Sequence, residues 1–187
     1  KNVKPTILIG VTGKAGLFDQ EIVSHIVEHV EEPIILPLSN PSAQSECIPQ
    51  EVLASTDQKI YMATGSPFTV TEKKESKGVS QCNNIFAFPG IAAGMVACQA
   101  KKLTTEMMIS AAEKISEYTY ENYKSEERVT PILSDLPDVT KATAMGVIES
   151  AIRTGHSELT IEISKENLES CSWQPNYLDY EYDESIS

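Results

Sequence analysis

Residues 34–43 read IILPLSNPSA, an aliphatic run that ends abruptly in the small polar pair Ser39-Asn40 and a proline. Two more apolar runs, TILIG at 6–10 and KIYMATG at 59–65, lie on either side of it in the chain. All three have the length and the turn-forming boundaries of strands. Glycine and short polar residues let a backbone approach a ligand closely, so the end of each strand is a candidate binding loop.

The segments between these strands favour helices. Residues 19–30, DQEIVSHIVEHV, place apolar side chains on one side of a helix and polar ones on the other. The apolar side chains are Ile22, Val23, Ile26, Val27 and Val30. Residues 42–56 have room for one or two helical turns, interrupted at Pro49. The alternation predicts an α/β fold with right-handed crossovers, part of a Rossmann-like doubly wound parallel sheet that is followed by C-terminal helices.

The second half of the chain predicts helices. Residues 88–100, FPGIAAGMVACQA, are apolar and small, which is typical of a helix buried against its neighbours. A longer helix follows with Thr105 as its N-cap, and a last helix spans about 138–153 and stops at Gly155. The long helix is expected to bury Met108, Ala112, Ile115 and Thr119.

Two charged segments are expected to lie outside this core. Residues 70–78, VTEKKESKG, predict a solvated loop. The acidic, aromatic segment WQPNYLDYEYDES at 173–185 is either disordered or packed on another surface. We therefore divide the chain into residues 1–156, the later half of a Rossmann-like domain with its following helices, and a tail at 157–187.

Composition excludes several classes of protein. The net charge of −12 argues against nucleic acid as a partner, because such affinity comes mainly from Lys and Arg. No apolar run is long enough to span a bilayer, so we expect no membrane partner. The cysteines Cys47, Cys82, Cys98 and Cys171 form no C-x-x-C pair, which favours a reducing, intracellular compartment over a zinc site or a disulfide framework.

The strand ends are expected to form a crevice. In a parallel sheet, the loops at 10–16, 39–41 and 65–67 gather at one edge, where ligands of such sheets bind. The first loop, G-x-x-G-x-x-G, matches the dinucleotide fingerprint only in part, and a plain strand-to-helix turn stays an alternative. No acidic residue ends the second strand to hold a ribose. If the fold binds a dinucleotide, this chain is its later half.

Two further motifs have competing interpretations. Asn83-Asn84 precede the buried helix and could orient a carboxylate or carboxamide, or could simply cap a turn. Residues 25–29, HIVEH, fit the zinc-binding pattern H-x-x-E-H. These histidines fall on the polar face of an amphipathic helix, so we interpret the motif as a solvated face and assign no metal site.

Several longer motifs, in this order and at these intervals, carry a family resemblance. They are GVTGKAGLF, PLSNPSAQSEC, YMATGSPF, NNIFAFPGIAAGMVAC, PILSDLPDV and SWQPNY. Together they resemble the later part of the cofactor-binding domain of malic enzymes and cover nearly the whole chain. The resemblance implies oxidation and decarboxylation of malate to pyruvate and CO2, with NAD or NADP and a divalent metal, Mg or Mn. The metal would polarise the C2 oxygen as a Lewis acid.

The resemblance also assigns roles to residues. Asn40 would contact malate and the nicotinamide ribose, and Asn83 and Asn84 would contact the substrate and the nicotinamide carboxamide. Cofactor contacts would come from Val11, Thr12, Gly13, Ser39 and Asn40.

The family's Lys base, Tyr acid and metal ligands have no match in this sequence, so we expect no catalytic residue and no metal ligand here, and an inactive isolated chain. Lys14 lies in the cofactor loop and receives no catalytic role. Cys82 stands where the family has a small Gly, which puts the local backbone conformation in question.

Two readings of function follow. The first is an enzyme piece whose partners are malate and NAD(P), part of a homo-oligomer, dimer or tetramer, in the cytoplasm or the mitochondrial matrix. The tail aromatics Trp173, Tyr177, Tyr180 and Tyr182 would suit an interface of such an oligomer. The alternative is a non-catalytic nucleotide- or dicarboxylate-binding module, a remnant of half a Rossmann domain.

Overall fold

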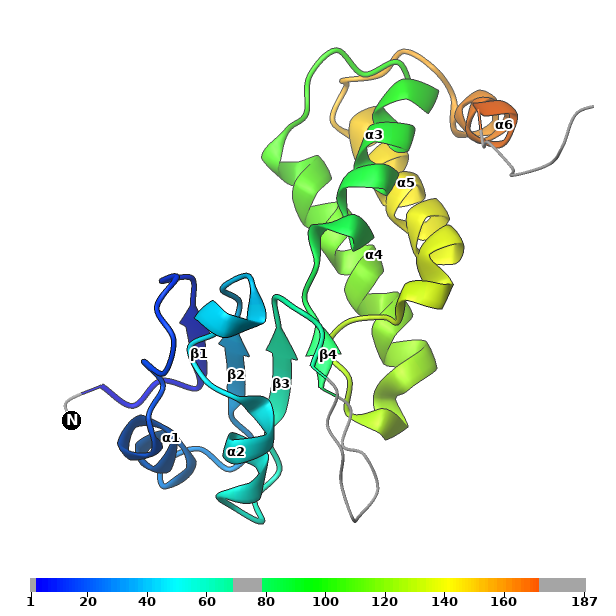
Figure 1. Cartoon of the computed structure of the whole chain (residues 1–187). Helices are drawn as coiled ribbons and strands as arrows, with labels where there is room; N and C mark the ends of the chain where they lie inside the picture. Colours follow the sequence, from blue (N-terminus) through cyan, green and yellow to red (C-terminus); the bar gives the residue numbers. More distant parts are fainter. Residues whose placement is uncertain (1–2, 69–78, 172–187) are drawn as a thin grey trace, which may run out of the picture.

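A four-stranded parallel sheet forms the first half of the molecule. The computed structural model describes residues 3–68 and 79–171 (Figure 1). The strands are β1 (Ile7–Gly10), β2 (Ile34–Pro37), β3 (Tyr61–Thr64) and β4 (Ser80–Gln81), in the spatial order β1-β2-β3-β4. Every neighbouring pair is parallel. The three predicted strands are confirmed, and β4 was not predicted because two residues are too few to show a pattern.

Helices α1 (Gln20–Val27) and α2 (Pro49–Ala54) cover one face of this sheet. Asp19 caps α1, since its Oδ1 accepts a hydrogen bond of 2.9 Å from the backbone N–H of Ile22. The core on this face consists of buried side chains from both helices, from β2 and β3, and from the segments that lead into α2 and β3. They are Val23, Ile26, Ile35, Cys47, Val52, Ile60 and Met62. The opposite face of β1 is open in the described part of the chain, where Ile7 and Ile9 are exposed.

The prediction for Pro49 was wrong in detail. Pro49 begins α2 instead of interrupting a helix. The first position of a helix suits proline, because its missing N–H would have no helical partner there and its φ is already helical. A separate short 3-10 turn, η1 (Ser42–Gln44), forms the other predicted piece.

Four longer helices lie beyond the β4 edge of the sheet (Figure 1). They are α3 (Phe88–Ala97), α4 (Thr105–Tyr123), α5 (Leu136–Arg153) and α6 (Ile161–Cys171). The short 3-10 turn η2 (Asn84–Phe86) leads from β4 into α3, and η3 (Lys124–Glu126) and η4 (Leu133–Asp135) lie between α4 and α5. Gly94 allows α3 to approach α5 closely, because a Cβ there would lie 2.7 Å from the carbonyl oxygen of Ala144. Helix α3 buries Gly90, Gly94 and Ala97 and packs against α5 and α6. Phe88 and Val96 are exposed, so the predicted burial holds for one side of this helix only.

The boundaries of the later helices correct three predictions. The N-cap of α4 is Thr104, one residue earlier than expected, and its Oγ1 accepts from Met107 N at 3.3 Å. The buried face of α4 accordingly carries Met107, Ala111 and Thr119, while the predicted Met108 and Ala112 are exposed. Helix α5 is not the last helix, although it does end before Gly155, whose φ of +72° confirms the left-handed cap. The segment that forms α6 is mostly polar, and it buries only Ser164 and Leu168.

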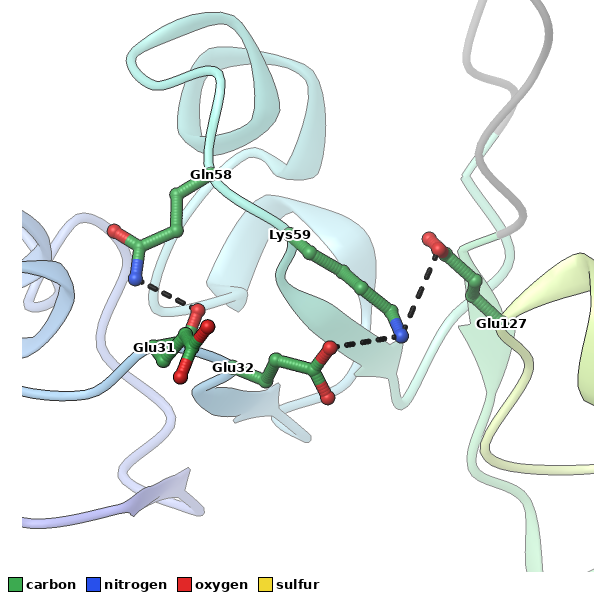
Figure 2. Close-up of polar contacts among 5 residues, drawn as sticks. All are labelled: Glu31, Glu32, Gln58, Lys59 and Glu127. Carbon is green, nitrogen blue, oxygen red and sulfur yellow. Dashed lines mark hydrogen bonds and ion pairs between the residues drawn. The ribbon is translucent and has the colours of Figure 1, made fainter.

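Polar contacts join the sheet to the helical part at the edge where the strands begin. Lys59 lies between Glu32 and Glu127, with Nζ 3.1 Å and 3.8 Å from their Oε1 atoms (Figure 2). Beside it, Gln58 Nε2 donates to the carbonyl oxygen of Glu31 at 2.7 Å. The chain after η3 then returns to the sheet, where Val129 N donates to Ser80 Oγ at 2.9 Å. These contacts fix the helices against the edge strand.

Two expectations from composition can be compared with the structure. All four cysteines are free, as expected without a disulfide framework. Among the described residues, no helix is both long enough and apolar enough to cross a bilayer. The predicted loop at 70–78 and the acidic aromatic tail lie outside the described residues.

Thr143 on α5 provides a test of this packing. Its hydroxyl is fully buried and makes no hydrogen bond within the described part of the chain. Thr143→Val keeps the shape and removes the unsatisfied group, so we expect the free energy of unfolding to rise by about 1 kcal/mol in urea titrations. Thr119→Val is the control, because the Thr119 hydroxyl does donate, to the Ile115 carbonyl at 2.7 Å, and its loss should stabilise nothing. Equal effects of the two substitutions would contradict the prediction.

Candidate functional site

The loops that follow the four strands lie side by side at one edge of the sheet. The hydrogen-bond ladder continues past the strand ends, where Leu38 N donates to Gly10 O at 2.8 Å and Gly65 N donates to Pro37 O at 3.3 Å. On the other side of β3, Cys82 N donates to Thr64 O at 2.9 Å. The loops after β1, β2 and β3 therefore gather as predicted, and the loop after β4 joins them.

Glu46 ties the first two of these loops together. Its side chain is fully buried between them, on the segment that connects η1 to α2. Glu46 Oε1 accepts from the backbone N–H and the hydroxyl of Thr12, both at 2.8 Å, and from Ser39 Oγ at 2.5 Å. Glu46 Oε2 accepts from Ser39 N at 3.3 Å. Ser39 Oγ in turn accepts from the backbone N–H of Gly13 at 2.8 Å, which extends the network.

This network sets the charge of Glu46. Burial alone would raise the pKa of the carboxyl, but the hydrogen bonds from Ser39 and from the backbone and hydroxyl of Thr12 outweigh it. Together they lower the pKa from 4.5 to about 2. Glu46 is therefore an anion throughout the physiological range, and its oxygens act as acceptors only.

The lowered pKa predicts how stability depends on pH. A folded-state pKa below the unfolded value stabilises the fold above pH 4.5, and this contribution is lost as the pH falls toward 2. We expect Glu46→Gln to cost on the order of 1–2 kcal/mol at neutral pH, less than the full shift, because the glutamine oxygen still accepts some of the hydrogen bonds. The difference in unfolding free energy from the unchanged chain, measured by urea titration, should shrink between pH 4.5 and 2. A difference that is constant over this range would show that Glu46 is not the titrating group.

The glycines of the G-x-x-G-x-x-G loop are required for two reasons, lack of space at Gly10 and a left-handed backbone at Gly13 and Gly16. A Cβ on Gly10 would lie 2.6 Å from Cγ and Cδ of Glu46, so Gly10 makes room for the buried carboxylate. Gly13 and Gly16 have φ of +67° and +70°, a conformation that side chains with a Cβ rarely adopt. The spacing of these glycines thus reflects one close contact with Glu46 and two left-handed backbone positions.

Asn40 lies at the exposed tip of the loop after β2. Its Oδ1 accepts a hydrogen bond from Ser66 Oγ, on the loop after β3. The peptide bond between Asn40 and Pro41 is cis. The Ser66 contact orients the amide so that its two N–H donors are the groups free to meet an acceptor on a ligand.

The Asn pair after β4 performs the capping role that was its alternative interpretation. Asn83 is the N-cap of η2, and its Oδ1 accepts from Ile85 N at 3.0 Å. Asn84 is exposed at the start of the same turn. Cys82 does not require a positive φ, so a side chain at this position is compatible with the backbone. Capping by the Asn83 oxygen still leaves its N–H groups available as donors.

The H-x-x-E-H motif lies at the opposite edge of the sheet from the strand-end loops. His25 Nε2 is 3.2 Å from the carbonyl oxygen of Val3, which precedes β1, so the motif is beside the edge where the strands begin. His25, Glu28 and His29 place ligand atoms within 4.8 Å of one another. Glu28 and His29 are exposed and His25 is half-buried, as expected for a solvated face.

Comparison with known proteins places this geometry in a family. The family described as "Malic enzyme, NAD binding domain" matches residues 1–152. This chain belongs to the malic enzyme family. The NAD-dependent malic enzyme of Escherichia coli (strain K12) is 40% identical over 182 residues, which are 96% of this chain and 32% of that enzyme. The chain thus spans about a third of the length of such relatives.

Solved structures of malic enzymes share the fold. The malic enzyme of Pyrococcus horikoshii superposes with a TM-score of 0.66 at 27% identity, over 89% of this chain and 35% of that one. The Entamoeba histolytica malic enzyme has a TM-score of 0.67 over 90% of this chain and 33% of its own. At 22% identity the latter supports the fold alone. The predicted fold class and family resemblance are confirmed.

In this malic enzyme chain, the structure groups some predicted site residues and separates others. Thr12, Gly13 and Ser39 belong to one hydrogen-bonded network, and Asn40 is linked through Ser66 to the next loop. Val11 is 75% exposed at the end of β1, with no such tie among the described residues. Glu46 was missed by sequence reasoning. The lack of space for a Cβ at Gly10 is what points to Glu46, and it can be recognised only in the folded structure.

Proposed function

We propose that this chain forms one wall of the crevice in which a malic enzyme binds NAD(P) and malate, and that the complete enzyme converts malate to pyruvate and CO2. The main support is the edge of the sheet at which the loops after the strands meet. There Glu46 fixes Thr12 and Gly13 beside Ser39 and Asn40. The edge is also where ligands of parallel α/β sheets bind.

The residues of this edge fit a nicotinamide cofactor. Bound there, NAD(P) would supply the acceptor for the hydride that leaves malate. Gly13 has no Cβ and is exposed, so the backbone from Val11 to Gly13 can approach the cofactor closely. The N–H groups of Asn40 would donate to a malate carboxylate or a ribose hydroxyl. Asn83 and Asn84 would contact the substrate and the carboxamide from the loop after β4.

The residues of this edge do not fit the divalent metal. Within residues 3–68 and 79–171, the cluster able to hold an ion is His25, Glu28 and His29, at the opposite edge of the sheet. Mg²⁺ and Mn²⁺ prefer carboxylate oxygens, and the strand-end loops present amides and hydroxyls. We therefore propose that the metal ligands, the Lys base and the Tyr acid all come from outside this chain.

A hybrid enzyme tests the proposal. In it, these 187 residues replace the matching part of the Escherichia coli NAD-dependent malic enzyme. We expect the hybrid to form reduced nicotinamide cofactor and pyruvate from malate with Mg²⁺ or Mn²⁺, and the isolated chain to form neither. Assays with NAD⁺ and with NADP⁺ separate the two cofactors. A folded hybrid that binds NAD⁺ without turnover would favour the alternative, a non-catalytic binding module.

The histidines of the H-x-x-E-H motif should be dispensable in this hybrid. We expect the double substitution His25→Gln and His29→Gln to leave kcat and KM for malate within about two-fold of the unchanged hybrid, because surface substitutions away from a site usually have small effects. Steady-state kinetics at saturating metal would check this. A large loss of turnover would assign the catalytic metal to this helix and overturn the placement above.

Other expectations stay predictions. The division into residues 1–156 and 157–187, the assembly of the complete enzyme as a dimer or tetramer, and its cytoplasmic or mitochondrial location are among them. Helix α6 places Leu168 in the core formed by α3, α4 and α5, so part of the second segment packs with the first.

A further inference from the structure

Glu46 is a buried carboxylate that forms no ion pair with a cation in residues 3–68 and 79–171. Among the described residues its side-chain contacts are hydrogen bonds, and the donors come from two loops, Thr12 on one and Ser39 on the other. A buried charge is costly unless its environment supplies strong hydrogen bonds. The two loops supply them, so the charge is stable only while both loops stay in place.

The two loops also depend on Glu46 for their positions. The backbone N–H groups of Thr12 and Ser39 point into the gap between the loops, and Glu46 is the acceptor of both. Gly13 reaches the carboxylate through Ser39 Oγ, which accepts from Gly13 N and donates to Glu46 Oε1. The main chain of Glu46 adds a further tie, because its carbonyl accepts from Phe18 N at 2.9 Å. One side chain therefore holds both loops in a fixed relation.

We propose that Glu46 is a positioning residue for cofactor binding: it sets the Thr12-Gly13 backbone against the Ser39-Asn40 loop and so gives the crevice its shape. The inference rests on the proposed function of these loops. Glu46 itself does not reach the ligand, since it lies beneath the loops with no exposed surface. It acts through the backbone of Thr12 and Gly13 and through Ser39.

The test measures hydrogen exchange in the 187-residue chain by NMR, and NAD⁺ affinity in the hybrid enzyme, because this chain supplies only one wall of the crevice. In Glu46→Gln the side-chain shape is kept, but the amide NH₂ replaces one acceptor oxygen and the charge is lost. We expect hydrogen exchange at the Thr12 and Gly13 amides to become roughly 10-fold faster or more, while exchange in α5 at Val147 and Ile148 stays unchanged. The Kd of the hybrid enzyme for NAD⁺, measured by isothermal titration calorimetry, should rise roughly 10-fold.

Two further variants sharpen the result. Glu51→Gln removes the same charge five residues away on α2 and should change neither exchange nor affinity. Ser39→Ala should release the Gly13 amide and leave the Thr12 amide protected, because Thr12 bonds to Glu46 directly. The double variant Ser39→Ala with Glu46→Gln should weaken NAD⁺ binding no more than Glu46→Gln does, since both act on one network.

The outcomes separate this inference from the proposed function. Unchanged exchange at Thr12 and Gly13 in Glu46→Gln, or faster exchange with unchanged NAD⁺ affinity, would overturn the positioning role. If the unchanged hybrid enzyme binds no NAD⁺, the proposed crevice fails, and with it the positioning role. If Glu46→Gln does not fold, Glu46→Asp decides: the shorter side chain keeps the charge but cannot reach both loops, so faster exchange at Thr12 and Gly13 and weaker NAD⁺ binding must then occur together.

Discussion

Asn40→Ala in the hybrid enzyme is expected to lower kcat/KM for malate by roughly 1–3 kcal/mol of transition-state stabilisation, which is up to about 150-fold. The reason is the loss of amide donors that would meet a charged carboxylate or a ribose hydroxyl. The Asn40 amide is exposed at the strand-end edge, and its oxygen is already engaged by Ser66. Steady-state kinetics with malate and with NAD⁺ varied in turn would show which ligand loses the contact.

Ser66→Ala is the matched control for this prediction. It removes the hydroxyl that donates to Asn40 Oδ1 but leaves the Asn40 amide in the chain. We expect a smaller loss of kcat/KM, because the amide is less well oriented but still present. If the two substitutions cost the same, Asn40 would matter only through its link to the loop after β3. Unchanged kinetics in Asn40→Ala would remove this residue from the site altogether.

The sequence carried enough information to predict the sheet because each of its first three strands is a short apolar run that ends in a loop of small residues. Those runs bury side chains such as Ile35 and Met62 against α1 and α2, so hydrophobicity and structure agree. Strand β4 has only two residues, and its place depends on pairing with β3 and on hydrogen bonds from Val129 and Thr130. Such pairing leaves no local pattern. Helix α6 escaped prediction for a related reason, since few of its side chains are buried.

The candidate site could be predicted in part for the same physical reason. Loops that follow parallel strands must meet, so the positions of Thr12, Ser39 and Asn40 followed from topology. Glu46 did not follow, because an acidic residue between two short helices usually belongs to a solvated surface. Its burial depends on N–H groups that point inward from residues far away in the chain, and on the absence of a Cβ at Gly10.

Gly65→Ala is expected to lower the free energy of unfolding by about 3 kcal/mol, the upper end of what overpacking usually costs. Gly65 is fully buried after β3, and its φ lies in the ordinary range, so alanine meets no backbone strain. A Cβ there would lie 2.8 Å from the carbonyl carbon of Leu38, closer still to its oxygen, and 3.0 Å from Asn40 Oδ1. The backbone of the loop after β2 must move, so the hybrid should also lose at least as much kcat/KM as with Asn40→Ala.

Gly155→Ala is the control that separates backbone strain from crowding, the two reasons why a position requires glycine. Gly155 has a φ of +72°, and a Cβ there would contact nothing within 4 Å, so alanine is strained without being crowded. We expect a cost of about 1 kcal/mol in stability and no change in kcat/KM, because left-handed strain in a helix cap is local. Urea titrations of both variants, with kinetics of both hybrids, make the comparison. If Gly65→Ala costs no more than Gly155→Ala, the loops after β2 and β3 are loosely packed, and the position of Asn40 does not depend on contact between them.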